Sequence, residues 1–137
     1  MFYHKLTNIP TVKIQKEKII TIQTKITGQK GEDTAAEYLV KQGYKIIARN
    51  VHFSRNCEID IIAQEKDTTV FVEVKTRSTL NFGHPFEAIN QQKIQKIHIG
   101  ILNYIKQNNI KKYRIDGIAV IGIKNPTIEH LKNLGYE

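Results

Sequence analysis

The chain has 137 residues, of which 40% are hydrophobic and 25% charged, a composition typical of one folded domain and too apolar for a disordered chain. Its single cysteine, Cys57, excludes an internal disulfide and a four-cysteine zinc site. No apolar run is long enough to cross a bilayer, and the first residues lack the apolar stretch of a signal peptide. We therefore expect a cytoplasmic protein with no membrane partner.

Positive charge is in excess, because 21 Lys and Arg against 13 Asp and Glu give a net charge of +8. Residues 1–30 contain six lysines and one glutamate, so five of these charges lie near the N-terminus. We expect a basic extension over residues 1–29 and a folded domain over residues 30–137. The extension is either a loosely attached segment or an arm that binds phosphate or a second copy of the chain. A nucleic acid is a plausible partner for such a chain, provided that a site lies beside the charge.

The chain after residue 30 predicts the element order αβββαβ. Apolar residues at helical spacing indicate a helix from Gly31 that ends before Gly43. Three segments rich in β-branched residues, 44–53, 58–63 and 69–77, are expected to be strands. A loop follows, then an amphipathic helix over 88–105 and a strand over 113–123, whereas the sequence after Pro126 fits no element clearly. This order predicts an α/β fold, a mixed sheet flanked by helices.

Alternation along two of the strands gathers charged side chains. In residues 69–77 the valines share one face, and Glu73, Lys75 and Arg77 share the other. In residues 58–63 the face that carries Asp60 is opposed by an apolar face. The residues expected on that apolar face are Cys57, Ile59, Ile61 and Ala63. We expect the apolar faces to be core and Cys57 to be a packing residue.

A hairpin between these strands would bring two acids together. If its turn is centred between Lys66 and Asp67, Asp60 lies opposite Glu73, with their Cβ atoms about 5 Å apart. Two carboxylates at that separation repel each other. A shared proton, a basic neighbour such as Lys75, or a divalent cation would offset the repulsion.

A third carboxylate is expected from the first helix. Glu32 precedes Ala36 by four residues and lies on the stripe that faces the sheet, whereas Glu37 points to solvent. The alternative is a solvated sheet face in which these charges form weak ion pairs. Phe71 and Ile62 share that face and need covering, which favours acids at the rim of a buried surface.

Taken in order, Glu32 on a helix, Asp60 on one strand and Glu73-x-Lys75 on the next resemble the PD-(D/E)xK nuclease superfamily. Five segments over Gly31 to Ile123 are more closely similar to the YraN-type family of that superfamily; they are GEDTAAEYLVKQGYKIIARN, CEIDIIA, VFVEVKTR, FGHP and RID. The resemblance implies a restriction-endonuclease-like fold. Archaeal Holliday junction resolvases are similar in the same elements, so branched DNA is the implied substrate class.

Carried over to this chain, the resemblance makes Asp60 and Glu73 ligands of Mg²⁺ or Mn²⁺, with the Val74 carbonyl as a third. Lys75 would orient the attacking water, and Glu32 would complete the site. The chain departs from the pattern at Cys57, where the family usually has glycine, and at Asn56, where the superfamily can have proline. Neither departure removes a ligand.

Other residues are expected to have supporting roles. Arg77, Lys93 and Lys96 could bind phosphates next to the cleaved one. Lys93 and Lys96 also fit an ordinary solvent-exposed helix surface. Asp116 is expected to bond a helix end or the backbone, and His84 to stabilise its loop or border the substrate.

Three functions are consistent with these features. The first is a metal-dependent endonuclease active in DNA recombination or repair. The second is a nucleic-acid-binding module that has lost turnover, and the third is a protein-interaction adaptor. The sequence does not distinguish DNA from RNA, and it leaves the oligomeric state open, although symmetric cutting of a junction requires a homodimer.

Overall fold

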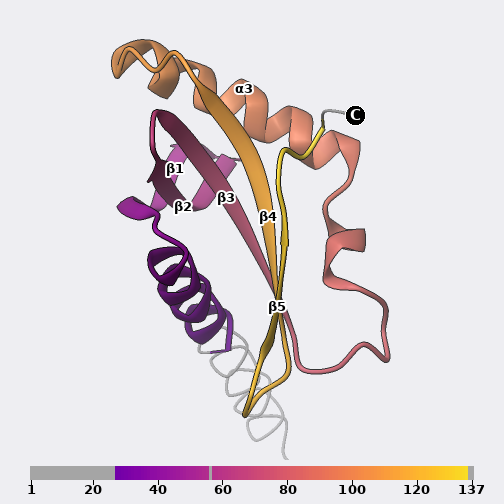
Figure 1. Cartoon of the computed structure of the whole chain (residues 1–137). Coiled ribbons are helices and arrows are strands. Elements are labelled where there is room, and N and C mark those ends of the chain that lie inside the picture. The colour runs from indigo at the N-terminus through magenta and orange to yellow at the C-terminus, as the bar shows by residue number, and fades with distance from the viewer. Residues whose placement is uncertain (1–26, 56, 136–137) are drawn as a thin grey trace, which may run out of the picture. The chain divides into compact units, whose positions relative to one another are not determined.

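A computed structural model describes residues 27–55 and 57–135 of the chain. The described residues contain one five-stranded sheet in the order β1-β2-β3-β4-β5 (Figure 1). The strands are β1 (Lys45–Ser54), β2 (Cys57–Glu65), β3 (Thr68–Arg77), β4 (Tyr113–Ile121) and β5 (Thr127–Leu131). The β3–β4 pair is parallel and the other pairs are antiparallel, so the predicted mixed sheet is confirmed. Asn56 and most of the predicted basic extension, residues 1–26, lie outside the described residues.

The helices follow the predicted order with small differences. Residues 27–41 are helical, and Gly43 has a φ of 93°, a left-handed conformation that suits a glycine after a helix end. The second helix, α3 (Gln91–Gln107), begins three residues later than expected, because the Asn90 side chain caps it by accepting the backbone N–H of Lys93 at 2.9 Å. Ala88 belongs instead to a short 3₁₀ helix, η1 (Pro85–Ala88). The tail that the sequence left undecided contains the edge strand β5.

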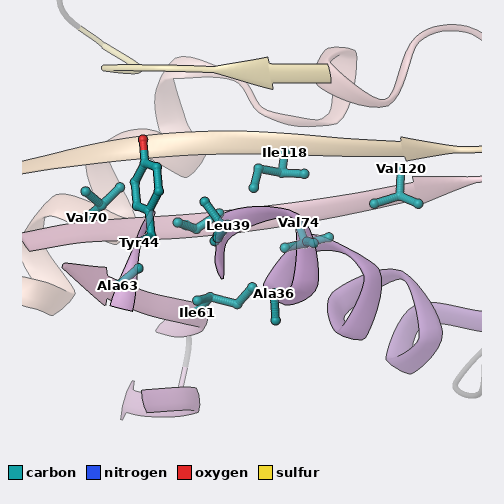
Figure 2. Close-up of a cluster of buried hydrophobic side chains, with 11 residues drawn as sticks. Ala36, Leu39, Tyr44, Ile61, Ala63, Val70, Val74, Ile118 and Val120 are labelled. Carbon is teal, nitrogen blue, oxygen red and sulfur yellow. The ribbon is translucent and has the colours of Figure 1, made fainter. Parts of the chain in front are cut away.

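The sheet has a buried apolar cluster on each face. On one face, Ala35 and Leu39 of the first helix pack against Val70, Val72 and Val74 of β3. Figure 2 labels Leu39, Val70 and Val74 of this cluster. On the other face, Ile97 and Ile101 of α3 pack against residues of three strands, namely Ile62, Phe71 and Ile115. The middle of β3 is therefore buried on both sides, which fits a central strand that links the parallel and antiparallel parts of the sheet.

The strand β2 changes faces at Asp60, and this corrects one prediction. Ile61 packs in the cluster under the first helix, but Ile59 packs in the cluster under α3, although alternation placed both on one face. The register puts Asp60 across from Asn50 of β1, between the pairs Arg49↔Ile61 and Val51↔Ile59. Asn50 has a φ of 52°, a left-handed conformation that asparagine tolerates better than most residues. The β1–β2 ribbon therefore turns at Asp60, and side chains on either side of it point to opposite faces.

Candidate active site

The predicted hairpin register is correct as far as the pairing extends. The β2–β3 ladder runs from Glu65↔Thr68 to Ile61↔Val72, with a turn centred between residues 66 and 67. Beyond Ile61 the ladder stops, and the Asp60 side chain accepts the backbone N–H of Val74 at 2.8 Å. Asp60 and Glu73 are thus not an opposed ladder pair. They lie where the two strands separate, and a side-chain carboxylate replaces the missing strand partner.

Asp60 is a half-buried acid that holds its proton unusually well. Burial raises its pKa, the nearby Glu73 carboxylate raises it further, and the result is a pKa of about 7 despite the Val74 N–H and the Lys75 charge. Burial also raises the pKa of Glu32, which shares a hydrogen bond with Asp60. A proton on one of these acids would relieve the repulsion between their carboxylates.

Glu32 reaches Asp60 because the first helix approaches β3 closely. A Cβ atom added to Gly31 would lie 2.0 Å from Oγ1 of Thr76, so only glycine leaves room for the Thr76 side chain against the helix. Thr76 directly follows Lys75 on β3. This contact sets the position of Glu32 beside the site strands, as the helical stripe predicted.

Glu73 is the most buried acid of the site, with 6% of its side chain exposed. Its Oε1 atom lies 3.4 Å from Nζ of Lys75 and 3.7 Å from Nζ of Lys93. Its Oε2 atom is buried and has no hydrogen-bond partner. Because an unsatisfied buried carboxylate oxygen costs free energy, this atom is a place where a ligand would be stabilising.

The chemistry of these donors fits a hard cation in part. Among residues 27–55 and 57–135, no three His, Cys, Asp or Glu side chains are grouped so as to hold a metal ion by themselves. The donors available at the fork, the point where β2 separates from β3, are the carboxylates of Asp60 and Glu73 and the Val74 carbonyl. In a strand, the N–H and C=O of one residue point to the same edge, so the Val74 carbonyl shares the edge whose N–H Asp60 accepts. Mg²⁺ is commonly held by one or two carboxylates, with water and substrate phosphate as the other ligands.

The predicted phosphate-binding residues take three different positions. Lys93 contacts Glu73 and so belongs to the acidic cluster. Lys96 is exposed and lines a cavity of about 330 Å³ together with Cys57, and Arg77 donates a hydrogen bond to the carbonyl of Thr76 at 3.2 Å. Cys57 itself is buried, and its sulfur packs where a Cβ on Gly100 of α3 would stand, which fits a packing role.

A second buried network surrounds Asp116, a residue expected to bond a helix end or the backbone. Asp116 accepts the backbone N–H of Asn133 at 2.9 Å, as expected, but also hydrogen bonds from Nε of Arg114 at 3.0 Å and Nε2 of His130 at 2.8 Å. Arg114 extends this network to the hydroxyl of Tyr44 at 2.7 Å. Sequence spacing could indicate the Arg114–Asp116 pair, since residues two apart on a strand share a face. It could not indicate His130, which lies on β5.

His84 also stabilises its loop, as expected. Its Nδ1 atom accepts the backbone N–H of Phe86 at 3.1 Å, which caps η1, and its Nε2 atom pairs with Glu129 of β5.

Arg49 of β1 is another charged residue that lies beside the site. Its guanidinium lies 2.6 Å from Asp33 and opposes the rise in the pKa of Glu32, which burial dominates.

Comparison with known proteins places the chain in a family. The family model described as "Uncharacterised protein family UPF0102" matches residues 31–120. The chain belongs to this family. The matched residues run from the close contact at Gly31 to Val120, one residue before the end of β4, and they include Glu32, Asp60, Glu73, Lys75 and Lys93. The family is the YraN-type family that the sequence motifs resemble, so that prediction is confirmed.

Curated UPF0102 relatives cover most of the described chain. The UPF0102 protein of Trichlorobacter lovleyi is 46% identical over 111 residues, 77% of this chain and 87% of its own length. Those of Paenarthrobacter aurescens and Persephonella marina are 40% and 42% identical, over 80% and 79% of this chain and 93% and 91% of theirs. Within the residues that the structure describes, no helix of this chain is both long and apolar enough to span a membrane.

Proposed function

We propose that this UPF0102 protein is a divalent-cation-dependent endonuclease that hydrolyses phosphodiester bonds of branched or otherwise structured DNA. The observation that carries the proposal is the buried, unpartnered Oε2 atom of Glu73 at the fork where β2 leaves β3. The half-buried Asp60 and two lysine ammonium groups lie beside it. An acidic cluster with an unsatisfied oxygen and adjacent positive charge is suited to a cation and a phosphate together.

The proposed roles follow from the positions of the side chains. Asp60, Glu73 and the Val74 carbonyl would hold Mg²⁺ or Mn²⁺, which when bound supplies a Lewis acid for the phosphoryl oxygen and lowers the pKa of a coordinated water. Lys75, held by Glu73 at 3.4 Å, orients the attacking water and stabilises the charge that develops during attack. Glu32 helps to keep Asp60 in place through their hydrogen bond.

Basic residues around the site support a nucleic-acid substrate. The net charge of +8 favours association with a polyanion, and Lys96 presents an exposed ammonium on the same helix as Lys93. Lys96 and Arg77 would bind phosphates next to the one that is cleaved. This function fits DNA recombination or repair in the cytoplasm, and cutting both strands of a symmetric junction would use a homodimer.

A second candidate function is a DNA-binding module that has the fold and the basic surface but no turnover. The observation in its favour is that no group of three or more metal-binding side chains occurs in the described part of the chain. The two functions differ in what a cation does. The module binds DNA equally well with and without it, whereas the nuclease requires it for cleavage.

Cleavage assays with matched variants test the proposal. The full chain is incubated with labelled four-way junction, flap, duplex and single-stranded DNA in Mg²⁺, Mn²⁺ or EDTA. We expect cleavage of a structured substrate that needs the cation and is lost in Asp60→Asn and Lys75→Ala, with DNA binding retained. Lys111→Ala, which removes an exposed lysine before β4, is the charge-matched control and should cleave normally. Cation-independent binding with no cleavage of any substrate would favour the binding module.

A further inference from the structure

Lys93 occupies a position in α3 that its charge makes locally unfavourable. It lies in the first turn of the helix, where its backbone N–H is held by the Asn90 cap, and this turn contains no acidic residue. The N-terminal end of a helix carries partial positive charge and disfavours a lysine. Residues that break a local rule in this way are expected mainly at functional sites, where another group compensates for them.

The compensating group is Glu73, a carboxylate that already has a lysine of its own. Nζ of Lys93 lies 3.7 Å from Oε1 of Glu73, the same oxygen that Lys75 contacts, while Oε2 has no partner. Lys75 comes from the same strand as Glu73, two residues along. Lys93 comes from a separate element, and its side chain is 34% exposed, so its ammonium is partly accessible to a ligand that arrives from solvent.

A count of charges shows what a bound cation would change. The charges of Lys75 and Lys93 balance those of Glu73 and of an ionised Asp60, the form in which Asp60 would hold a cation. With a divalent cation held between these acids, the four side chains and the ion carry two positive charges in excess. A phosphodiester supplies one negative charge and a cation-bound hydroxide the other, so the charges balance only when substrate and nucleophile are both present.

We propose that Lys93 is a substrate-binding residue that Glu73 holds in the cation-free protein and that a bound cation frees to contact the scissile phosphate. This inference rests on the proposed function and deepens it. It separates the two lysines, since Lys75 stays with Glu73 and the attacking water while Lys93 transfers to a non-bridging phosphate oxygen. Cation binding and DNA binding are therefore linked through one side chain.

Two binding measurements test this linkage without relying on cleavage. The first is calorimetric titration of Mn²⁺ into the full chain, with Lys93→Met, Lys93→Arg and the control Lys111→Met. Removing the ammonium removes a competitor of the cation for Glu73, so Lys93→Met should bind Mn²⁺ about tenfold more tightly than the parent chain. Lys93→Arg should resemble the parent. A purely structural lysine would give unchanged or weaker Mn²⁺ binding in Lys93→Met, which would overturn the proposal.

The second measurement is junction DNA affinity in Ca²⁺ and in EDTA. We expect Lys93→Met to weaken DNA binding about tenfold in Ca²⁺ and by less than about twofold in EDTA, because Lys93 reaches phosphate only when a cation has freed it. Equal losses in both conditions would mean that Lys93 is an ordinary phosphate contact and would contradict the linkage. If the parent chain cleaves nothing but both expected binding patterns appear, the endonuclease proposal fails and the inference about Lys93 holds. If the parent chain cleaves and Lys93→Met changes neither binding pattern, the endonuclease proposal holds and the inference about Lys93 fails.

Discussion

Two buried carboxylates on neighbouring strands of this sheet have opposite surroundings. Asp116 of β4 is fully buried, and a guanidinium, an imidazole and a backbone N–H each donate to it. Burial alone raises the pKa of Asp116, but the hydrogen bonds from His130, Arg114 and Asn133 outweigh burial and leave the pKa below its usual value. Glu73 of β3 is almost as buried, yet one of its oxygens has no partner.

The difference indicates which acid is structural and which has a place for a ligand. The network of Asp116 is complete, so it joins β4, β5 and the segment after β5 and leaves nothing for a ligand to add. The Asp60–Glu73 cluster is incomplete, and burial together with the nearby Glu73 carboxylate raises the pKa of Asp60. Substitutions should therefore affect stability at Asp116 and function at Asp60.

The largest expected effect is on cleavage by Asp60→Asn. Loss of a carboxylate that holds the cation should lower the cleavage rate about 1000-fold or more. Stability should not fall, since the amide is neutral at every pH and does not repel the carboxylates of Glu73 and Glu32. Rates from single-turnover assays, combined with urea unfolding of the same samples, check both parts. Slow cleavage that merely accompanies unfolding would remove Asp60 from the chemistry.

The next largest effect is on stability, from Asp116→Asn. An amide cannot replace the carboxylate that pairs with Arg114, and breaking a buried ion pair costs about 3–5 kcal/mol of unfolding free energy. Urea unfolding followed by circular dichroism measures this loss. Asp67→Asn, which breaks an exposed pair with Lys112, is the control and should leave the unfolding midpoint unchanged. A small effect at Asp116 would mean that its network contributes little and would weaken the comparison.

Cation binding should stabilise one cluster and leave the other unaffected. A ligand that binds only the folded state at one hundred times its dissociation constant adds about 2.7 kcal/mol of stability. We expect Mn²⁺ to raise the melting temperature of the parent chain and of Asp116→Asn, and to have no effect on Asp60→Asn. Differential scanning fluorimetry with and without EDTA makes this measurement. An equal shift in all three chains would indicate a cation site elsewhere.

The smallest effects concern pH, and the two acids should act in opposite directions. The folded-state pKa of Asp60, about 7, is above its ordinary value, so its contribution to stability is greatest at low pH and is lost as pH rises toward 7 and beyond. The pKa of Asp116 is lowered, so its contribution is present at neutral pH and is lost as pH falls below the ordinary range of an aspartate. Urea midpoints in EDTA across pH 2 to 8, on the parent and Asp60→Asn, separate the two. If the urea midpoint of the parent chain changed with pH in the same way as that of Asp60→Asn, the raised pKa of Asp60 would be contradicted.

Part of this arrangement could be predicted from the sequence because it depends on local patterns. Alternation along β3 correctly separates the buried valines from Glu73 and Lys75, and the turn between Lys66 and Asp67 fixes the β2–β3 register. The face change at Asp60 could not be predicted, since it follows the left-handed backbone of Asn50 in a neighbouring strand.

Long-range pairing explains the other differences. His130 joins Asp116 only because β5 pairs with β4, and β5 lies in a segment whose sequence favours no element. Lys93 looked like a helix-surface residue because helical spacing indicates which side chains share a face and not what that face meets. The side chain that it meets is Glu73, from a strand twenty residues earlier in the chain.

Anomalous diffraction from a crystal soaked in Mn²⁺ tests the central claim most directly. The account predicts one strong peak at the fork of β2 and β3, bonded to a carboxylate oxygen of Asp60 and to Oε2 of Glu73, with Nζ of Lys93 moved away from Glu73. The prediction would be contradicted if the crystal bound Mn²⁺ at full occupancy at other positions, showed no peak at this fork and kept Lys93 paired with Glu73.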